Sequence, residues 1–474
     1  MPKSVTAIWN KTINLLKDKK KLLNGINFML AIILALFPFI IFLDALIFNS
    51  VNPFPVSEWS MLYVCYLIVY VTFNLKSLFK KRTKNKLEKW ILWLTIIALS
   101  LVVITPIFNR VLTINNLEMF WYLMVFACLI NLKKKQLKLF IEIFLFSLAF
   151  SCLCGIIDPT CLFMPGFHYT WQHSLFFYQQ NYSSTIIAMA IIAISNMLLN
   201  EKNKLKISIY ISYLVLMFLF MFLNGSFAGI TSVFAIFIFE FIFFSIKNKK
   251  VNYHFLSLFL AFAVTNFLVD LIPNIENIRT CPYNYFIECV AVFDNAFNTH
   301  ILNIFGIDYV PGADGWDRSE LLRRSLYAVL GGDSTNFFYR VSTTLFGLGG
   351  GTLHKLAPHN LFVGAWVDFG LIFAIIFMAV IILIIVYQIK NSKIKLDIYP
   401  WFFASISFLI TTLVGGLILY PFFYFIIFLA IGFNIAKNQS KEEDKNLLNE
   451  NNPTDELIKN EQSISETKEN IQSQ

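Results

Sequence analysis

The sequence is poor in charge: only 14% of its 474 residues are Asp, Glu, Lys or Arg, whereas 57% are apolar and 52 are phenylalanine. This composition excludes an ordinary soluble domain and is typical of a protein that crosses a membrane many times. The lysines are divided among short turns rather than gathered on one face. The net charge of +9 therefore does not indicate nucleic-acid binding.

Three other features are missing. The seven cysteines show no metal-ligand spacing, and Cys281 and Cys289, which share a predicted outer loop, are equally consistent with a disulfide or with two free thiols. No outer cluster of acidic residues has the spacing of metal ligands, so we expect no metal and no cofactor. No small-residue cleavage site follows the basic segment Lys11–Lys21, which makes the first apolar run an anchor and not a cleavable signal peptide.

Long apolar windows predict the fold class. Windows of roughly 20 residues, bounded by turn or charged residues, predict an all-α polytopic transmembrane bundle of about 12 spans. The windows are 26–48, 56–78, 89–108, 117–132, 139–157, 182–199, 205–223, 227–246, 252–272, 359–389, 398–414 and 416–436.

The same windows divide the chain into five segments. The predicted segments are a basic cytoplasmic N-terminus (1–25), spans 1–9 (26–272), a long extracytoplasmic helical loop (273–357), spans 10–12 (358–436) and a disordered cytoplasmic tail (437–474). The tail is rich in polar residues and has no aromatics, so it lacks the apolar surface to fold alone.

Lysine and arginine fall on opposite sides of this threading. Of 31 lysines, 30 lie on the side of the N-terminus, and six of the seven arginines lie on the other side; Lys355 and Arg82 are the exceptions. The positive-inside rule makes the lysine side cytoplasmic, with both termini there. That rule does not explain the outer arginines. A guanidinium group can donate two parallel hydrogen bonds to one phosphate, whereas an ammonium group acts as a point charge.

The outer arginines are therefore candidates for binding a diphosphate. The candidates are Arg279, Arg318, Arg323 and Arg340. The alternative is that the outer arginines are remnants of a lysine-biased composition and pair with outer carboxylates.

One amphipathic helix is predicted within the outer loop. Asp317-x-x-Glu320 resembles a capping box, and Leu322, Leu326, Val329 and Leu330 follow at helical spacing until Gly331-Gly332. On a helical wheel Arg318 falls inside the apolar arc, Arg323 on its border and Arg324 away from it. Arg318 is then the best ligand contact, unless it pairs with an acidic neighbour such as Asp314.

Pro358-His359-Asn360 begins the tenth predicted span. Proline fits a first helical turn, and the helix dipole there favours a neutral imidazole and nearby anions, so His359 is a candidate general base. The alternative is a histidine that only caps the helix. Gly370 shares the His359 face and permits close approach of another helix, whereas Asp368 lies on the far side, which argues against an Asp–His dyad.

The stretch from Pro358-His359-Asn360-Leu361-Phe362 to Asp368-Phe369-Gly370-Leu371-Ile372 follows a glycine-rich turn and a long outer loop. It resembles the O-antigen ligase and polysaccharide polymerase family, and Gln180-Asn181 at the start of a span fits as well. The resemblance implies a catalytic His359, a diphosphate-binding arginine in Arg318-x-x-x-Leu322, and roles in substrate contact or helix packing for Asn360, Gly370 and Asn181.

Two positions depart from the family pattern. Phe227 stands where the family has an arginine, so half of the expected anion clamp is missing unless Arg279 or Arg340 replaces it. Phe373 stands where a glycine is usual, which affects packing.

The reaction that the resemblance implies is inverting, metal-independent glycosyl transfer on the outer side of the cytoplasmic (inner) membrane of a bacterium. The donor is a polyprenyl-diphosphate-linked oligosaccharide embedded in membrane lipid, and the acceptor is a growing glycan or the lipid A core. The sequence does not choose between polymerase and ligase. The alternative from another class is a polytopic transporter or lipid-linked glycan flippase, against which stand the lack of an internal repeat and the scarcity of charge within the spans.

Overall fold

The computed structural model describes residues 19–38, 86–109, 119, 122, 125–126, 128–157, 180–224, 227–270, 318–349, 361–392, 398–415 and 424–438. These residues are helical with short connections, and no strand occurs among them. The all-α prediction is confirmed for this part of the chain.

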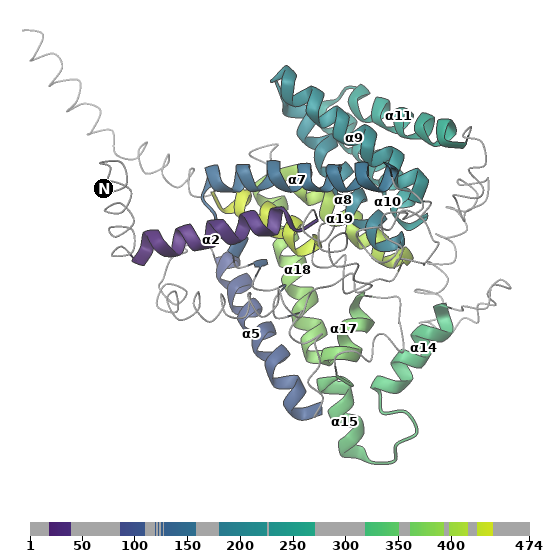
Figure 1. The fold of residues 1–474 in the computed structure, drawn as a ribbon. Coiled ribbons are helices and arrows are strands. Elements are labelled where there is room, and N and C mark those ends of the chain that lie inside the picture. The colour runs from purple at the N-terminus through teal and green to yellow at the C-terminus, as the bar shows by residue number, and fades with distance from the viewer. Residues whose placement is uncertain are drawn as a thin grey trace, which may run out of the picture.

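The helices follow one another along the chain as labelled in Figure 1. They are α2 (Lys19–Ala35), α5 (Lys86–Asn109), α7 (Lys134–Ile157), α8 (Gln180–Asn200), α9 (Lys204–Asn224), α10 (Phe227–Asn248), α11 (Tyr253–Asp270), α14 (Arg318–Val329), α15 (Phe337–Phe346), α17 (Leu361–Phe369), α18 (Leu371–Ser392) and α19 (Tyr399–Gly415). A further helix, Tyr424–Asn438, follows α19.

Six of the described helices, α5, α7, α8, α9, α10 and α18, are long and apolar enough to cross a membrane. A membrane-embedded protein is the direct interpretation, because an uncharged apolar helix of about 20 residues matches the thickness of a bilayer core. The six coincide with predicted windows. The count of about 12 spans and the long outer loop between spans 9 and 10 remain predictions.

One predicted window is divided in the structure. The tenth window, 359–389, was expected to be one helix, but the structure has α17 and α18 separated at Gly370, whose φ of +91° a helix interior does not allow. The last described helix ends at Asn438, close to the predicted start of the tail at about Lys437.

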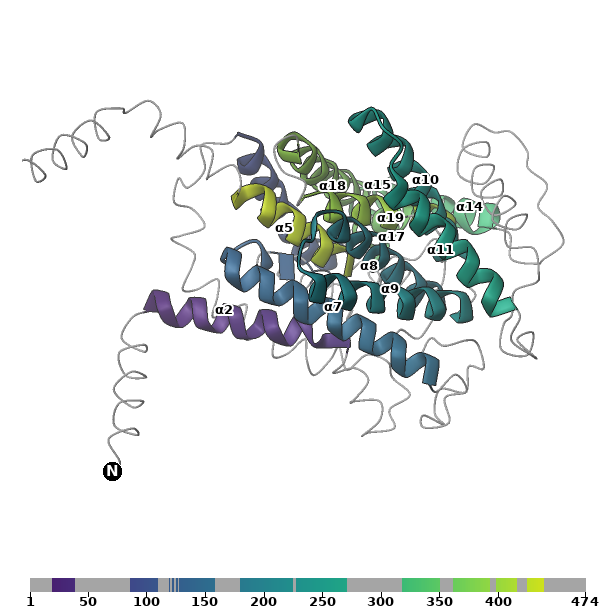
Figure 2. The same cartoon turned by 90° about the horizontal axis from the view of Figure 1, so that it is seen from above.

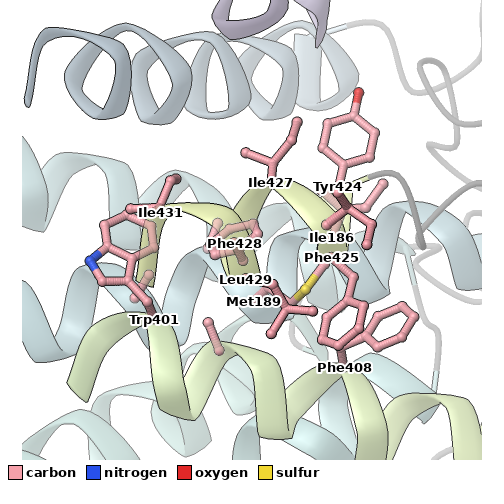
Figure 3. Packing of buried hydrophobic residues seen from close by; sticks show 14 of the residues in the cluster. Ile186, Met189, Trp401, Phe408, Tyr424, Phe425, Ile427, Phe428, Leu429 and Ile431 are labelled. Carbon is pink, nitrogen blue, oxygen red and sulfur yellow. The ribbon is translucent and has the colours of Figure 1, made fainter. Parts of the chain in front are cut away.

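Phenylalanine and small residues together build the core. Figure 3 shows side chains of α8, α19 and the helix Tyr424–Asn438 interleaved, and the rings of Phe408 and Phe425 stack with centroids 4.0 Å apart. Trp401 packs on Phe428 at 5.8 Å. Offset aromatic pairs of this kind are worth roughly 0.5–1.5 kcal/mol beyond the area that they bury.

Small side chains let α8 approach α10 and let α10 approach α19. A Cβ added to Gly229 of α10 would lie 2.6 Å from the Cβ of Ser184 of α8, so only glycine fits there. Ser232 of α10 and Ser407 of α19 bring their hydroxyl oxygens to 2.7 Å. Small residues and interhelical hydroxyl bonds are characteristic of helix packing in membranes. Seen from above in Figure 2, α2 lies along α7, on the side of the core away from α10.

The lysine-bearing helix ends come together. Lys247, near the end of α10, donates a hydrogen bond to the Tyr399 hydroxyl at the start of α19 (2.7 Å). Lys437 lies 3.8 Å from the Glu88 carboxylate at the start of α5. Lys206 near the start of α9 forms an ion pair with Glu142 of α7. We call this assembly of helix ends the lysine face.

The arginine-bearing helices α14 and α15 lie elsewhere. The end of α5 that is remote from Lys86 carries Phe108, whose ring stacks on Phe346 of α15 with centroids 4.3 Å apart. In Figure 1, α5 and α18 run from the body of the protein toward α15, α17 and α14. Lys437 therefore lies at one end of α5, a candidate span of 23 residues, and α15, which carries Arg340, lies at the other end.

Candidate functional site

Several predicted site residues lie outside the described part of the chain. These are His359, Asn360 and Arg279. For Arg318 and Asn181, the first residue of α14 and the second residue of α8, the structure describes the backbone but not the side chain. The roles of these five residues remain predictions, and the structure tests only the scaffold that surrounds them.

The scaffold starts with α14. The predicted amphipathic helix is confirmed: it runs from Arg318 to Val329, and Leu322 and Val329 are buried. Gly331 and Gly332 end it with φ of +98° and +53°, values that favour glycine. Leu330, expected on the apolar face, is instead 43% exposed.

The apolar face of α14 packs on α17. Leu322 and Val329 form a small cluster with Val363 and Val367 of α17, and Trp366 packs against its edge. Because α17 begins at Leu361, two residues after His359, this contact joins the predicted arginine helix to the helix that follows the predicted base. The sequence did not show that these two segments are in contact, because about 30 residues separate them along the chain.

Arg323 and Arg324 lie on the exposed side of α14. The wheel distinguished them by placing Arg323 at the border of the apolar arc, but in the folded helix both are open to solvent. Each takes part in contacts within the protein, so their exposure alone does not assign them to a ligand.

A hairpin joins α14 to α15 and positions Arg340. The Arg340 Nε donates a hydrogen bond to the Leu330 carbonyl at 3.3 Å, and a Cβ at Gly331 would lie only 2.5 Å from the Arg340 Cγ. The arginine side chain therefore lies across the glycine turn. On the same hairpin the Tyr327 hydroxyl donates to Asp333, and this hydrogen bond raises the pKa of Tyr327.

The start of α15 carries an aromatic group that the sequence argument missed. Asn336 caps the helix, with its side-chain oxygen accepting from the backbone N–H groups of Phe338 (3.0 Å) and Tyr339 (3.2 Å). Phe337, Phe338 and Tyr339 are all exposed. Adjacent exposed aromatics in a membrane protein are typical of the bilayer interface, and the Phe-Phe-Tyr run after a capping asparagine was the available signal.

The end of α15 is bonded directly to α17. Trp366 Nε1 donates to the Thr344 carbonyl at 2.9 Å, and the Leu348 N–H donates to the Val367 carbonyl at 2.7 Å. These two bonds fasten residues 344–348 along α17 as a strap. The strap, α14 and α17 together form the assembly that we call the arginine scaffold.

Gly370 lies where the strap meets the break between α17 and α18. A Cβ there would lie 2.1 Å from the Leu345 carbonyl oxygen, and one at Gly347 would lie 2.6 Å from the Gly370 nitrogen. Close approach at Gly370 was predicted, and the structure identifies the partner as the end of α15. Asp368, two residues earlier, is fully buried, and Phe373 stacks on Phe377 with ring centroids 5.4 Å apart.

A second group of predicted residues lies at the start of α8 and α10. Asn181 belongs to the first turn of α8, and Phe227 is the first residue of α10. The Gly229–Ser184 contact joins these two helix starts, so the segment with the expected asparagine lies beside the segment that lacks the expected arginine.

Among the described residues, no three His, Cys, Asp or Glu side chains are grouped so that they could hold a metal ion. The scaffold offers cationic and aromatic side chains and glycine-rich backbone instead. Its chemistry suits the recognition of an anion next to a membrane surface.

Comparisons with protein-family models, with curated proteins and with solved structures find no match to this chain.

Proposed function

We propose that this protein transfers a glycan from a polyprenyl-diphosphate carrier to a sugar hydroxyl of an acceptor, on the arginine-bearing side of the membrane. The observation that carries the proposal is the packing of α14 on α17. It joins a helix with three arginines to the helix that begins two residues after His359.

The spacing along α14 supports Arg318 as the anion contact. Helical periodicity puts Arg318 on the same face as Leu322 and Ser325, which are four and seven residues further on and are buried. That face is the one turned toward α17. Arg340 of α15 supplies a second guanidinium beside this scaffold, with its Nε already oriented by the Leu330 carbonyl.

In the proposed reaction His359 accepts the proton of the acceptor hydroxyl while that oxygen attacks the anomeric carbon of the donor. The bond from this carbon to the diphosphate breaks, the diphosphate leaves with the electron pair, and the configuration inverts. Arginines stabilise the charge that develops on the leaving group. A positioned general base contributes roughly 100- to 10,000-fold to the rate, so loss of His359 should leave little activity.

The test is His359→Asn in cells that lack the native gene. Asparagine keeps a polar side chain suited to a helix start but cannot accept a proton at neutral pH. We expect normal protein level in the membrane, loss of long or acceptor-linked glycan, and accumulation of the lipid-linked donor. His354→Asn, five residues earlier in the same loop, is the matched control and should behave like the native protein. Normal glycan with His359→Asn would refute the general-base mechanism.

One observation favours transport as a second candidate. Glu240 is fully buried within the candidate span of α10, where its carboxylate accepts a hydrogen bond from the Asn196 side chain of α8. Its second oxygen has no hydrogen-bond partner among the described residues. Ionisable groups in spans often lie on substrate or proton pathways. A protein that moves the lipid-linked glycan would accumulate it on the inner leaflet when disabled, whereas a disabled transferase would accumulate it on the outer leaflet.

A further inference from the structure

A cavity opens at the lysine face, remote from the arginine scaffold. It has a volume of about 290 Å³ and lies among the starts of α7, α9 and α19 and the ends of α8 and the helix Tyr424–Asn438. Its size is near the lower end of small-molecule sites, which run from roughly 300 to 1,000 Å³. It therefore suits a compact headgroup better than a whole oligosaccharide.

The wall of the cavity is mostly apolar. Leu137 and Ile141 of α7 line one side, and Met197 of α8 and Trp401 of α19 line others. Leu137, Ile141 and Met197 lie near the ends of the candidate spans α7 and α8, which puts this apolar surface near the level at which acyl chains meet headgroups. A ligand that fills the cavity must therefore offer an apolar part as well as a polar one.

Lysines line the polar part of the cavity. Lys134 and Lys138 are exposed, and they lie four residues apart on the same side of the first turns of α7. Like charges at this spacing repel each other, and positive charge at a helix N-terminus also opposes the helix dipole. Lys134 already takes part in an interaction within the protein, and an anion that binds between the two lysines would reduce both penalties further.

The acidic residues of the lining are already engaged. Glu142 forms an ion pair with Lys206. The Glu201 carboxylate accepts the backbone N–H groups of Asn203 and Lys202, each at 2.9 Å, and these bonds lower its pKa, so it stays charged but satisfied. Counting charges, three lysines face two glutamates, which leaves one net positive charge at a cavity whose carboxylates have partners.

We propose that this cavity binds an anionic phospholipid of the leaflet on the lysine side, with its phosphate at Lys134 and Lys138 and the upper part of an acyl chain on the wall formed by Met197 and Trp401. Basic pockets between spans on the cytoplasmic side are the usual form of an anionic headgroup site. The site lies on the opposite side of the membrane from the proposed glycan transfer, so it is not the donor site.

The experiment uses the full-length protein in nanodiscs and in detergent, with phosphatidylglycerol and phosphatidylcholine as probes and bound lipid counted by native mass spectrometry. We expect the native protein to retain phosphatidylglycerol preferentially. Lys134→Gln with Lys138→Gln should weaken that retention about 30-fold, because each lysine near an anionic headgroup contributes on the order of 1 kcal/mol. Lys250→Gln with Lys390→Gln removes the same charge from exposed turns outside the cavity and should leave the retention unchanged.

A third variant separates lipid from soluble anion. Met197→Trp fills the apolar part and keeps both lysines, so it should weaken phosphatidylglycerol retention but not the binding of inorganic phosphate. Equal losses in the two double-lysine variants would overturn the proposal, because general surface charge would then explain the lipid preference. If inorganic phosphate alone stabilises the detergent-solubilised protein as much as phosphatidylglycerol does, and Met197→Trp does not change this effect, the occupant is a soluble anion. That result would also overturn the proposal.

Discussion

Gly370→Ala tests whether the strap holds the arginine scaffold together. At φ of +91° an alanine is in a left-handed conformation, which costs roughly 1–2 kcal/mol for an L residue. Its Cβ would also lie 2.1 Å from the Leu345 carbonyl oxygen and 2.5 Å from the Phe346 Cα, which are backbone atoms that cannot rotate away. Overpacking of this kind costs about 1–3 kcal/mol, so the total is on the order of 2–5 kcal/mol.

The strain acts on the contact between the strap and α17, whose hydrogen bond from Leu348 to Val367 must lengthen when the strap moves. We expect local opening of α15, measured as trypsin cleavage after Arg340 in the purified protein. When opening is fast, the cleavage rate follows the population of the open form, so 2 kcal/mol corresponds to about a 30-fold increase.

Gly25→Ala is the control for this prediction. An added Cβ at Gly25 of α2 meets nothing within 4 Å, and alanine in a helix stabilises by roughly 0.5–1 kcal/mol relative to glycine. This variant should show native cleavage. If Gly370→Ala is cleaved at the native rate and keeps full glycan transfer, the strap does not hold the scaffold.

Three further predictions follow from the topology and the buried groups. Arg318→Lys should impair glycan transfer nearly as much as Arg318→Ala, because lysine loses the two-pronged geometry, whereas Arg324→Lys should be tolerated; equal tolerance of both lysines in a transfer assay would leave no diphosphate clamp on α14. A reporter that is active only outside the membrane should give signal when fused after residue 300 and none when fused after residue 440, and the reverse pattern would invert the whole assignment. Glu240→Gln should keep both the hydrogen bond from Asn196 and glycan transfer. Glu240→Leu removes one hydrogen-bond partner of the Asn196 amide, so it should lower the free energy of unfolding by about 1–3 kcal/mol and reduce the level of folded protein. Lost activity with Glu240→Gln at a normal protein level would favour transport.

Local signals in the sequence were enough to predict many of the elements. The windows for α8, α9, α10 and α11 agree with the described helices to within a few residues, because lysine turns and apolar runs act on adjacent residues. The capping box and the Gly331-Gly332 stop likewise predicted α14, since each depends on backbone groups within one turn. Counting spans also predicts the opposite placement of lysine and arginine, which remains a prediction.

Tertiary structure alone decided how these elements meet. The contact of α14 with α17, the approach of Leu345 to Gly370 and the pairing of Glu240 with Asn196 each join segments that are separated in the sequence, and no periodicity within one helix specifies its partner. Leu330 shows the same limit, because α14 ends at Val329 and Leu330 is left 43% exposed in the folded protein. The cavity at the lysine face exists only because five helix ends converge, so its residues could be identified as basic in the sequence but not as a site.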